Sequence, residues 1–334
     1  MNTCGSPIAR PLHCKHVFHM SRRPGRRMML HSSRDDDVYV SRIYEALKLQ
    51  YGETSAKRVL QSLSFAAAGQ EYTRFHPDKG LQKASSYITG LSAEPFHDVS
   101  SPHFTWMMRL EEEYSIIRDE LNSALLNPRL TTLGNHIWAS AAREEAIAYG
   151  PDWKTLVLQD RCVWEDTNCK LFPKTVELLR KNSVPSVEVF FARQAPDTGI
   201  KPHTDNTNFI LTSHLGLDVP EGECWMKVGE FKREWMNGRG MIADTSFIHS
   251  TANESRTQTR YVLIVRFWHP DLTPEECCAL QFLFDALNES SEDGIANAMK
   301  LATKRQGKSK PVLGKASKKR EKAGGLGLLA KGMK

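Results

Sequence analysis

Short apolar runs with a two-residue period fill the chain from residue 186 onward, and they constrain the fold more than any other feature. Val187, Val189 and Phe191 occupy every second position of the first run, and alternation of this kind is typical of a β-strand. Turn residues separate the later runs, and no helical pattern lies between them. Several short strands at close spacing predict an antiparallel sandwich or barrel. Further strands are expected at 208–217, 224–228, 240–244 and 260–268.

Helical periodicity dominates the residues before this region. The spacing of apolar residues predicts short helices at 38–51 and 54–68, and a longer helix at 106–125 with one apolar stripe. Residues 70–103 contain several Gly and Pro residues and are expected to form a loop. One more short helix is expected to start at Pro173. The prediction is therefore a helical N-terminal half followed by a β-rich C-terminal half.

Composition excludes several classes of protein. The longest uninterrupted apolar run has about five residues, whereas a membrane-spanning helix needs about 18. No transmembrane segment is therefore expected. The seven cysteines are odd in number and include no Cys-x-x-Cys pair, which argues against a disulfide scaffold and a structural zinc site. This cysteine usage favours a reducing compartment.

The basic residues are concentrated at the two ends of the chain. Residues 1–34 contain seven Lys and Arg and no acidic residue, and residues 304–334 contain eleven Lys and Arg and one Glu. The formal net charge of +6 leaves −11 for the residues between, once the +7 and +10 of the ends are subtracted. An acidic body is not expected to bind nucleic acid. For the basic C-terminal tail, nucleic-acid binding and a nuclear or ribosome-associated docking role both stay open.

Residues 1–35 form a basic leader that is interrupted by Pro and Gly. This composition suits either an organellar transit peptide or a disordered, solvated segment, and it lacks the apolar core of a secretory signal. A transit peptide would place the protein in a mitochondrion or plastid. If the segment is only a disordered leader, the cytoplasm and the nucleus are the expected locations.

Three His-x-Asp triplets occur, beginning at His76, His203 and His269. On a strand, residues two apart point to the same face, so such a triplet can present both side chains to one metal ion. The triplet at His76 lies in the predicted loop and lacks the helix that a J-domain needs after its HPD motif. The triplet at His269 is expected to form a turn, because Pro270 interrupts the strand before it. His203 differs from these two. It lies at the mouth of a predicted strand. A second isolated histidine, His249, follows a predicted strand 46 residues later.

His203, Asp205, His249 and Arg260 occur in the order that one class of iron site requires. Non-haem Fe(II) oxygenases bind the metal through two His and one carboxylate and keep the other positions open, here for a 2-oxo acid and O2. An arginine can hold the far carboxylate of that acid through a two-pronged hydrogen bond. The alternative is that these four residues are ordinary polar residues of the surface and core.

Three stretches of the sequence resemble the aspartyl/asparaginyl β-hydroxylase family: PHTDNTNFILTSHLGL at 202–217, DTSFIH at 244–249 and RYVLIVRFWHPDLTPEE at 260–276. Four shorter stretches extend the resemblance upstream: GLSAEPFHD, LEEEYSIIRDEL, NCKLFPKT and APDTGIKPH. The resemblance covers 86–285, about 60% of the chain. The expected division is the leader at 1–35, a helical segment at 36–85, a hydroxylase-like catalytic domain at 86–285, and a linker with a basic disordered tail at 286–334.

This resemblance implies a mainly β catalytic domain with the double-stranded β-helix fold, which is a cupin-like jelly roll. It also implies Fe(II), 2-oxoglutarate as co-substrate, O2 and ascorbate as an accessory reductant. His203 and His249 match the two iron ligands of the family, His214 matches a histidine near the 2-oxoglutarate, and Arg260 matches the arginine that holds its far carboxylate. The reaction implied is hydroxylation at an unactivated carbon.

Three further residues match motif positions without an assigned role: Asn208, Trp235 and Asp244. Asp244 is expected either to orient His249 or to form a turn at the end of a strand. Three aromatic residues are expected either to wall the reaction pocket or to belong to the core: Phe190, Phe191 and Trp225.

The sequence departs from the animal members of the family in three ways. The animal enzymes have glycine at the position of Asp205 and bind iron through two histidines only. Asp205 is expected to restore the carboxylate ligand, and the alternatives are that it points away or binds substrate. Two arginines of the animal motif are replaced by Thr212 and Ile210, which puts the animal substrate specificity in doubt. The membrane anchor and helical repeats of the animal proteins are not recognised here, so an epidermal-growth-factor-like target is not expected.

Together these features predict an Fe(II)- and 2-oxoglutarate-dependent dioxygenase that hydroxylates an aspartyl, asparaginyl or similar side chain of a polypeptide. One alternative is a small-molecule hydroxylase with the same chemistry. Another is a non-catalytic β-helix binding module.

Overall fold

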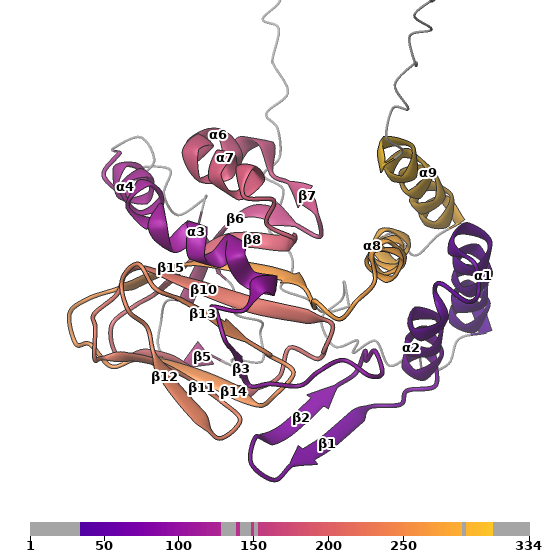
Figure 1. Ribbon diagram of the computed structural model, residues 1–334, viewed down its shortest axis with the longest axis horizontal. Helices are drawn as coiled ribbons and strands as arrows, with labels where there is room; N and C mark the ends of the chain where they lie inside the picture. Colours follow the sequence, from indigo (N-terminus) through magenta and orange to yellow (C-terminus); the bar gives the residue numbers. More distant parts are fainter. Residues whose placement is uncertain (1–33, 128–137, 141–147, 150–152, 289–291, 310–334) are drawn as a thin grey trace, which may run out of the picture.

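Two antiparallel β-sheets face each other and form a double-stranded β-helix (Figure 1). The computed structural model describes residues 34–127, 138–140, 148–149, 153–288 and 292–309. The larger sheet has the order β3-β13-β10-β15-β8-β6-β4, with β7 paired to β6, and the smaller has the order β12-β11-β14-β9-β5. The bounds of these strands are β3 Phe96–His97, β4 Ala139–Ser140, β5 Ala148–Tyr149, β6 Trp153–Asp160, β7 Val163–Trp164, β8 Ser186–Gln194, β9 Thr198–His203, β10 Ile210–Asp218, β11 Cys224–Val228, β12 Phe231–Glu234, β13 Gly240–Ala243, β14 His249–Asn253 and β15 Arg260–Trp268.

The two faces of the larger sheet pack against different partners. Val262 and Ile264 of β15 pack between the sheets with Met226 of β11, whereas Leu263 and Val265 belong to a separate core on the outer face. This division follows from the two-residue period of a strand. Four helices cover the outer face (Figure 1): α3 Thr105–Glu112, α4 Tyr114–Leu125, α6 Asp166–Leu171 and α7 Pro173–Lys181. Because helices cover the outer face of the larger sheet, a site formed by its strands is expected in the space between the two sheets.

A second group of helices joins the two ends of the described chain: α1 Arg34–Tyr51, α2 Lys57–Ala67, α8 Pro274–Asn288 and α9 Glu292–Ser309 (Figure 1). Their apolar faces form one core with Ile88 and Phe209 beside the β-sandwich. The segment expected to be a linker and basic tail, 286–334, instead contains the end of α8 and the helix α9 as far as Ser309, because Ala298 and Ala302 are buried against the other helices. Residues 310–334, like the leader at 1–33, lie outside the described residues.

A β-hairpin occupies part of the segment that was expected to be a loop. Its strands are β1 Tyr72–His76 and β2 Gly80–Ala84. The hairpin docks on the β-sandwich: the backbone N–H of Ile248 donates to the oxygen of Leu81, and that of Lys83 donates to the oxygen of Ser246. The expected boundary at residue 85 therefore separates residues that pack together.

Several other predicted elements are confirmed and some were missed. The strands at 224–228 and 260–268 have the predicted bounds, and the strands at 186, 208 and 240 are present with small differences. The expected helix at 106–125 is interrupted at Glu113 and forms α3 and α4. Ten strands of the described residues were not predicted, and the longest of those in the two facing sheets are β6, β9, β12 and β14. His249 consequently begins a strand after a turn, rather than following one.

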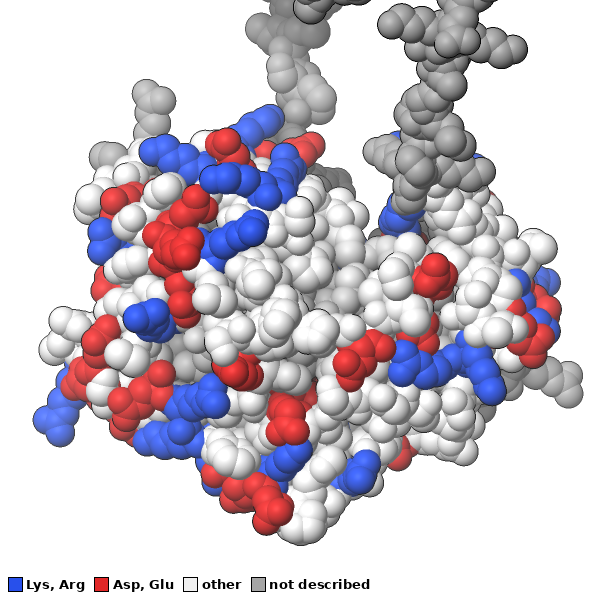
Figure 2. Space-filling view, in the orientation of Figure 1, with Lys and Arg blue, Asp and Glu red and all other residues white. Residues whose placement is uncertain are grey.

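Acidic and basic side chains are intermingled on the face that Figure 2 shows. Among the described residues of that face, no continuous basic surface of the kind that phosphate binding needs is visible. In the part of the chain that the structure describes, every helix is too short or too polar to cross a bilayer.

Candidate metal and co-substrate site

His203 and His249 face each other across two neighbouring strands of the smaller sheet. His203 ends β9, His249 begins β14, and the antiparallel register places the two residues opposite one another. Their ring centroids are 4.2 Å apart. The register shifts immediately after this pair, between His249 and Thr251. The pairing brings together two ring nitrogens that the sequence separates by 46 residues.

Backbone carbonyl groups fix the orientation of both imidazole rings. Nδ1 of His203 lies 2.8 Å from the oxygen of Lys201, and Nδ1 of His249 lies 3.0 Å from the oxygen of Phe247. A carbonyl oxygen only accepts hydrogen bonds, so Nδ1 carries the proton and Nε2 offers its lone pair. Burial, reinforced by His203, lowers the pKa of His249 to about 4. Both features suit a neutral histidine that binds a metal through Nε2.

Asp205 brings a carboxylate to the same point. Its backbone N–H donates to the oxygen of Thr245, 2.9 Å away, which ties the residue to the turn before β14. Oδ1 of Asp205 lies 3.8 Å from Nε2 of His203 and 3.9 Å from Nε2 of His249. Burial would raise the pKa of Asp205, but Arg266, His249 and His203 outweigh it and hold this pKa well below the usual range. The carboxylate is therefore ionised.

The three side chains form a cluster that fits a divalent iron site. One ligand atom from each of His203, Asp205 and His249 lies within 4.8 Å of the others. Two imidazoles and one carboxylate on one side of an ion are the donor set of non-haem Fe(II) oxygenases, in which the remaining positions stay open to other ligands. The structure brings the three side chains together, and their geometry fits Asp205 as a third ligand.

Two buried polar side chains, Arg260 and His214, lie between the sheets near this cluster. Arg260 has 1% of its surface exposed, and its guanidinium carbon lies 4.1 Å from the ring centroid of Trp235. Nε and Nη1 of Arg260 and both ring nitrogens of His214 have no hydrogen-bond partner among the described residues. Burial lowers the pKa of Arg260 to about 10, and burial together with Arg260 lowers the pKa of His214 to about 3.

Such unpaired buried donors are costly unless a ligand satisfies them. An ionised carboxylate is the group that a buried guanidinium pairs with best. The guanidinium of Arg260 therefore fits the far carboxylate of 2-oxoglutarate, and Trp235 provides the aromatic surface under Arg260.

Comparison with known proteins agrees with this geometry. Residues 111–270 match the family model of aspartyl/asparaginyl β-hydroxylase. Residues 111–270 of this chain therefore belong to the aspartyl/asparaginyl β-hydroxylase family. Mouse aspartyl/asparaginyl β-hydroxylase is 28% identical over 210 residues, which cover 61% of this chain and 27% of the mouse protein. This chain thus matches about a quarter of the length of that relative.

Two other relatives have names that differ from that of the mouse protein. Human aspartate β-hydroxylase domain-containing protein 2 is 32% identical over 140 residues, which cover 40% of this chain and 38% of that protein. The ornithine lipid ester-linked acyl 2-hydroxylase of Rhizobium tropici is 28% identical over 187 residues, which cover 55% of this chain and 64% of that protein. The names of the family's members therefore include hydroxylases of different substrates.

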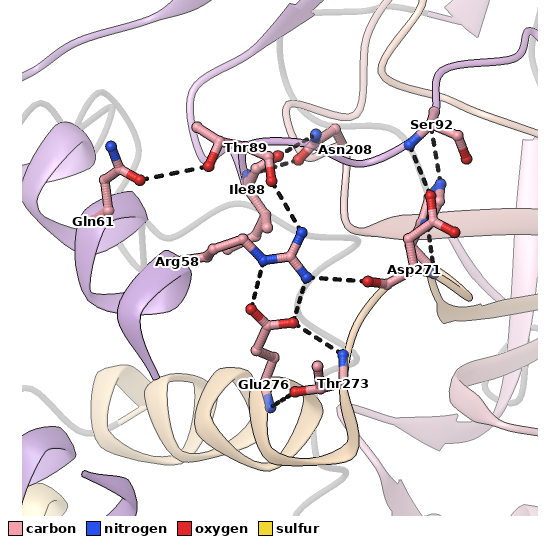
Figure 3. Close-up of polar contacts among 10 residues, drawn as sticks. Arg58, Gln61, Ile88, Thr89, Ser92, Asn208, Asp271, Thr273 and Glu276 are labelled. Carbon is pink, nitrogen blue, oxygen red and sulfur yellow. Dashed lines mark hydrogen bonds and ion pairs between the residues drawn. The ribbon is translucent and has the colours of Figure 1, made fainter. Parts of the chain in front are cut away.

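The remaining motif residues of the β-hydroxylase domain have structural contacts. Asn208 exchanges two hydrogen bonds of 2.9 Å with the backbone of Ile88 and so fixes the loop after the hairpin (Figure 3). Oδ1 of Asp244 accepts hydrogen bonds from the N–H and hydroxyl of Ser246, so Asp244 forms the turn before β14. Of the two roles expected for Asp244, the structure supports the turn.

The three aromatic residues do not form one wall. Phe190 lies between the sheets, whereas Phe191 belongs to the outer core of the β-hydroxylase domain. Trp225 is half-buried and donates to Glu254 from its indole nitrogen. The triplets at His76 and His269 are also outside the metal cluster, and each histidine has its own partner, Gln82 and the oxygen of Ser92 respectively.

Two charged residues beside the candidate metal cluster were missed by the sequence analysis. Arg266 lies on β15 opposite Glu188 on β8, and both are buried. Each is a charge within an apolar run, RYVLIVRFW and SVEVFFA. That pattern was the available signal, because a charge on the inward face of a buried strand requires a partner.

Proposed function

We propose that this chain is an Fe(II)- and 2-oxoglutarate-dependent dioxygenase that hydroxylates an aspartyl, asparaginyl or similar side chain of a polypeptide. The observation that carries the proposal is the convergence of Nε2 of His203 and Nε2 of His249 on Asp205. The unpaired guanidinium of Arg260 beside this cluster supports it further.

Each residue has a distinct part in this proposal. His203, His249 and Asp205 would hold the iron, and Arg260 and His214 would hold the far carboxylate of 2-oxoglutarate. When bound, iron and 2-oxoglutarate supply chemistry in which O2 converts 2-oxoglutarate to succinate and CO2 and one oxygen atom enters a C–H bond of the substrate. The carbonyl groups of Lys201 and Phe247 keep both imidazoles in the tautomer that can bind a metal.

Burial of the co-substrate pocket contributes selectivity. Arg260, His214 and Trp235 are each 5% exposed or less, so water is largely excluded from the place where a carboxylate would bind. In a site of low polarity the attraction between guanidinium and carboxylate is stronger than in water. The same burial argues against a non-catalytic binding module, because such a module gains nothing from an unpaired buried guanidinium.

A small-molecule or lipid substrate is the second candidate for the same chemistry. Two points favour this candidate. The match with this chain includes 64% of the lipid hydroxylase of Rhizobium tropici but only 27% of the mouse relative. In the resemblance described above, Thr212 and Ile210 stand where the animal motif has arginines. We place the polypeptide substrate first because the mouse protein, named for aspartyl and asparaginyl residues, matches more of this chain.

The test is succinate formation from 2-oxoglutarate by the full chain with Fe(II), ascorbate and O2. A peptide library and a set of acylated amino-acid lipids serve as separate substrate pools. We expect turnover with peptides, and a loss of at least about 100-fold in His249→Ala because a ligand is removed. His103→Ala, an exposed histidine on a different element, is the matched control and should behave as the wild type.

Each outcome decides between the candidates. Turnover with the lipid pool alone would replace the polypeptide proposal by the second candidate. If the wild type binds neither Fe(II) nor 2-oxoglutarate, the dioxygenase proposal is wrong.

A further inference from the structure

Arg266 and Glu188 form an ion pair within the apolar interior. Nη1 of Arg266 lies 3.5 Å from Oε2 of Glu188, and the two side chains are 2% and 5% exposed. They lie opposite each other in the register of β15 and β8. Both project from the inward face of the larger sheet, toward the metal cluster of the smaller sheet.

The second amino group of Arg266 reaches Asp205. Nη2 of Arg266 lies 3.4 Å from Oδ2 of Asp205, whereas Oδ1 of the same carboxylate faces the Nε2 atoms of both histidines. The two carboxylate oxygens of Asp205 therefore have different partners. Oδ2 lies beside the guanidinium of Arg266, and Oδ1 faces the two Nε2 atoms.

The backbone alone does not fix this orientation. The hydrogen bond from the N–H of Asp205 to the oxygen of Thr245 fixes the main chain, whereas the carboxylate itself is contacted by the side chain of Thr245 and by Arg266. Stability does not explain the charged cluster either, because well-packed apolar residues of similar volume usually serve a buried position at least as well. A role in orienting Asp205 accounts for both the burial and the geometry.

We infer that Arg266 is a positioning residue for the metal site, which holds Oδ2 of Asp205 so that Oδ1 is presented as the third protein ligand. Glu188 keeps Arg266 in place from the neighbouring strand. This inference rests on the proposed function, because it assigns Asp205 to the metal. The groups around a metal ligand that fix its orientation typically change metal affinity by about 10- to 100-fold when they are removed.

The test measures Mn(II) binding to the full chain by electron paramagnetic resonance, without co-substrate or turnover. We expect Arg266→Met to weaken Mn(II) binding by about 10-fold or more, and Arg266→Lys to recover part of that loss. In an Asp205→Ala background, Arg266→Met should change the affinity by less than about twofold, because its effect acts through Asp205. Circular dichroism checks that each variant is folded.

A second variant keeps the test decisive if Arg266→Met does not fold. Glu188→Leu/Arg266→Met replaces the ion pair by apolar residues of similar volume, so it leaves neither partner of that pair buried alone. It should also weaken Mn(II) binding by about 10-fold. Wild-type affinity in the folded variant, or equal losses with and without Asp205, would overturn the inference while the proposed function stands. Absence of Mn(II) binding in the wild type would overturn both.

Discussion

At the scale of single residues, the site depends on buried charges whose partners come from distant parts of the chain. Arg260, His203 and His249 could be predicted from the sequence because iron and a dicarboxylate restrict the residue types and their order. Arg266 and Glu188 could not be assigned in this way, because their pairing depends on the register of β15 and β8. That register shifts between Arg266 and Phe267, and the strand sequences do not reveal the shift.

Replacement of Arg260 by lysine tests the co-substrate pocket. Lysine keeps the charge but loses the planar fork that holds a carboxylate through two hydrogen bonds. We expect Arg260→Lys to raise the KM for 2-oxoglutarate by about 10- to 100-fold, which corresponds to roughly 1.4–2.8 kcal/mol. Arg256→Lys, at an exposed position four residues earlier, is the control. An unchanged KM in Arg260→Lys would remove Arg260 from the pocket.

Asp244 makes folding stability depend on pH. Burial raises its pKa from 3.8 to about 7, so the folded protein holds a proton that the unfolded chain releases between these values. The free energy of unfolding should therefore fall as the pH rises from about 4 to 7. Asp244→Asn cannot titrate, and the wild type should lose a few kcal/mol relative to it over this range, at about 1.4 kcal/mol for each unit of pKa shift. Urea unfolding at several pH values measures the difference, and a constant difference would contradict the prediction.

At the scale of elements, the two strands that carry the histidines were the hardest to predict. β9 has the sequence TGIKPH, in which Gly and Pro are both unfavourable for a strand. β14 is HSTAN, which is short and mostly polar. Both strands exist because they pair with each other and with β11 and β5 on either side. The strong strands β10 and β15 were predictable because their own residues specify them.

Docking of the hairpin requires a glycine at position 229. Gly229 has φ +54°, and a Cβ atom there would lie 1.8 Å from the carbonyl oxygen of Lys79. Its N–H also donates to Ile248, the residue before His249. We expect Gly229→Ala to lower the free energy of unfolding by about 3 kcal/mol or more, with contributions from backbone conformation and overpacking. Metal affinity should fall as well.

Gly222→Ala separates the two contributions. Gly222 also has positive φ, +80°, but nothing lies within 4 Å of an added Cβ atom. This variant should cost only about 1–2 kcal/mol and leave metal binding unchanged. Equal losses in the two variants, measured by urea unfolding, would show that hairpin docking contributes little.

At the scale of the whole molecule, one polar network ties the first helices to the last. Arg58 on α2 donates to Glu276 on α8, with 2.6 Å between Nε and Oε1, and to the carbonyl oxygens of Thr89 and Asp271 (Figure 3). Asp271 in turn accepts from the N–H of Ser92. The network closes the helical group against the loop that leads into the β-sandwich. A single sequence gives no sign of such a contact, because the residues of the network lie far apart in the chain.

Loss of Arg58 should therefore destabilise the protein more than loss of an ordinary surface cation. We expect Arg58→Ala to lower the free energy of unfolding by about 2 kcal/mol, because Glu276 is 5% exposed and would be left without its main cation. Lys48→Ala, which removes a more exposed pair with Glu53, should cost less than about 0.5 kcal/mol. A similar small change in both variants would contradict this account.

The contact between α2 and α8 also affects how the chain is made. Arg58 and Glu276 are separated by 218 residues. At a synthesis rate of about 5–20 residues per second, α2 waits roughly ten to forty seconds for its partner to be translated. During that interval the apolar face of α1 and α2 has no C-terminal helices to cover it. The core that α1 and α2 share with α8 and α9 therefore forms only after translation has passed these C-terminal helices.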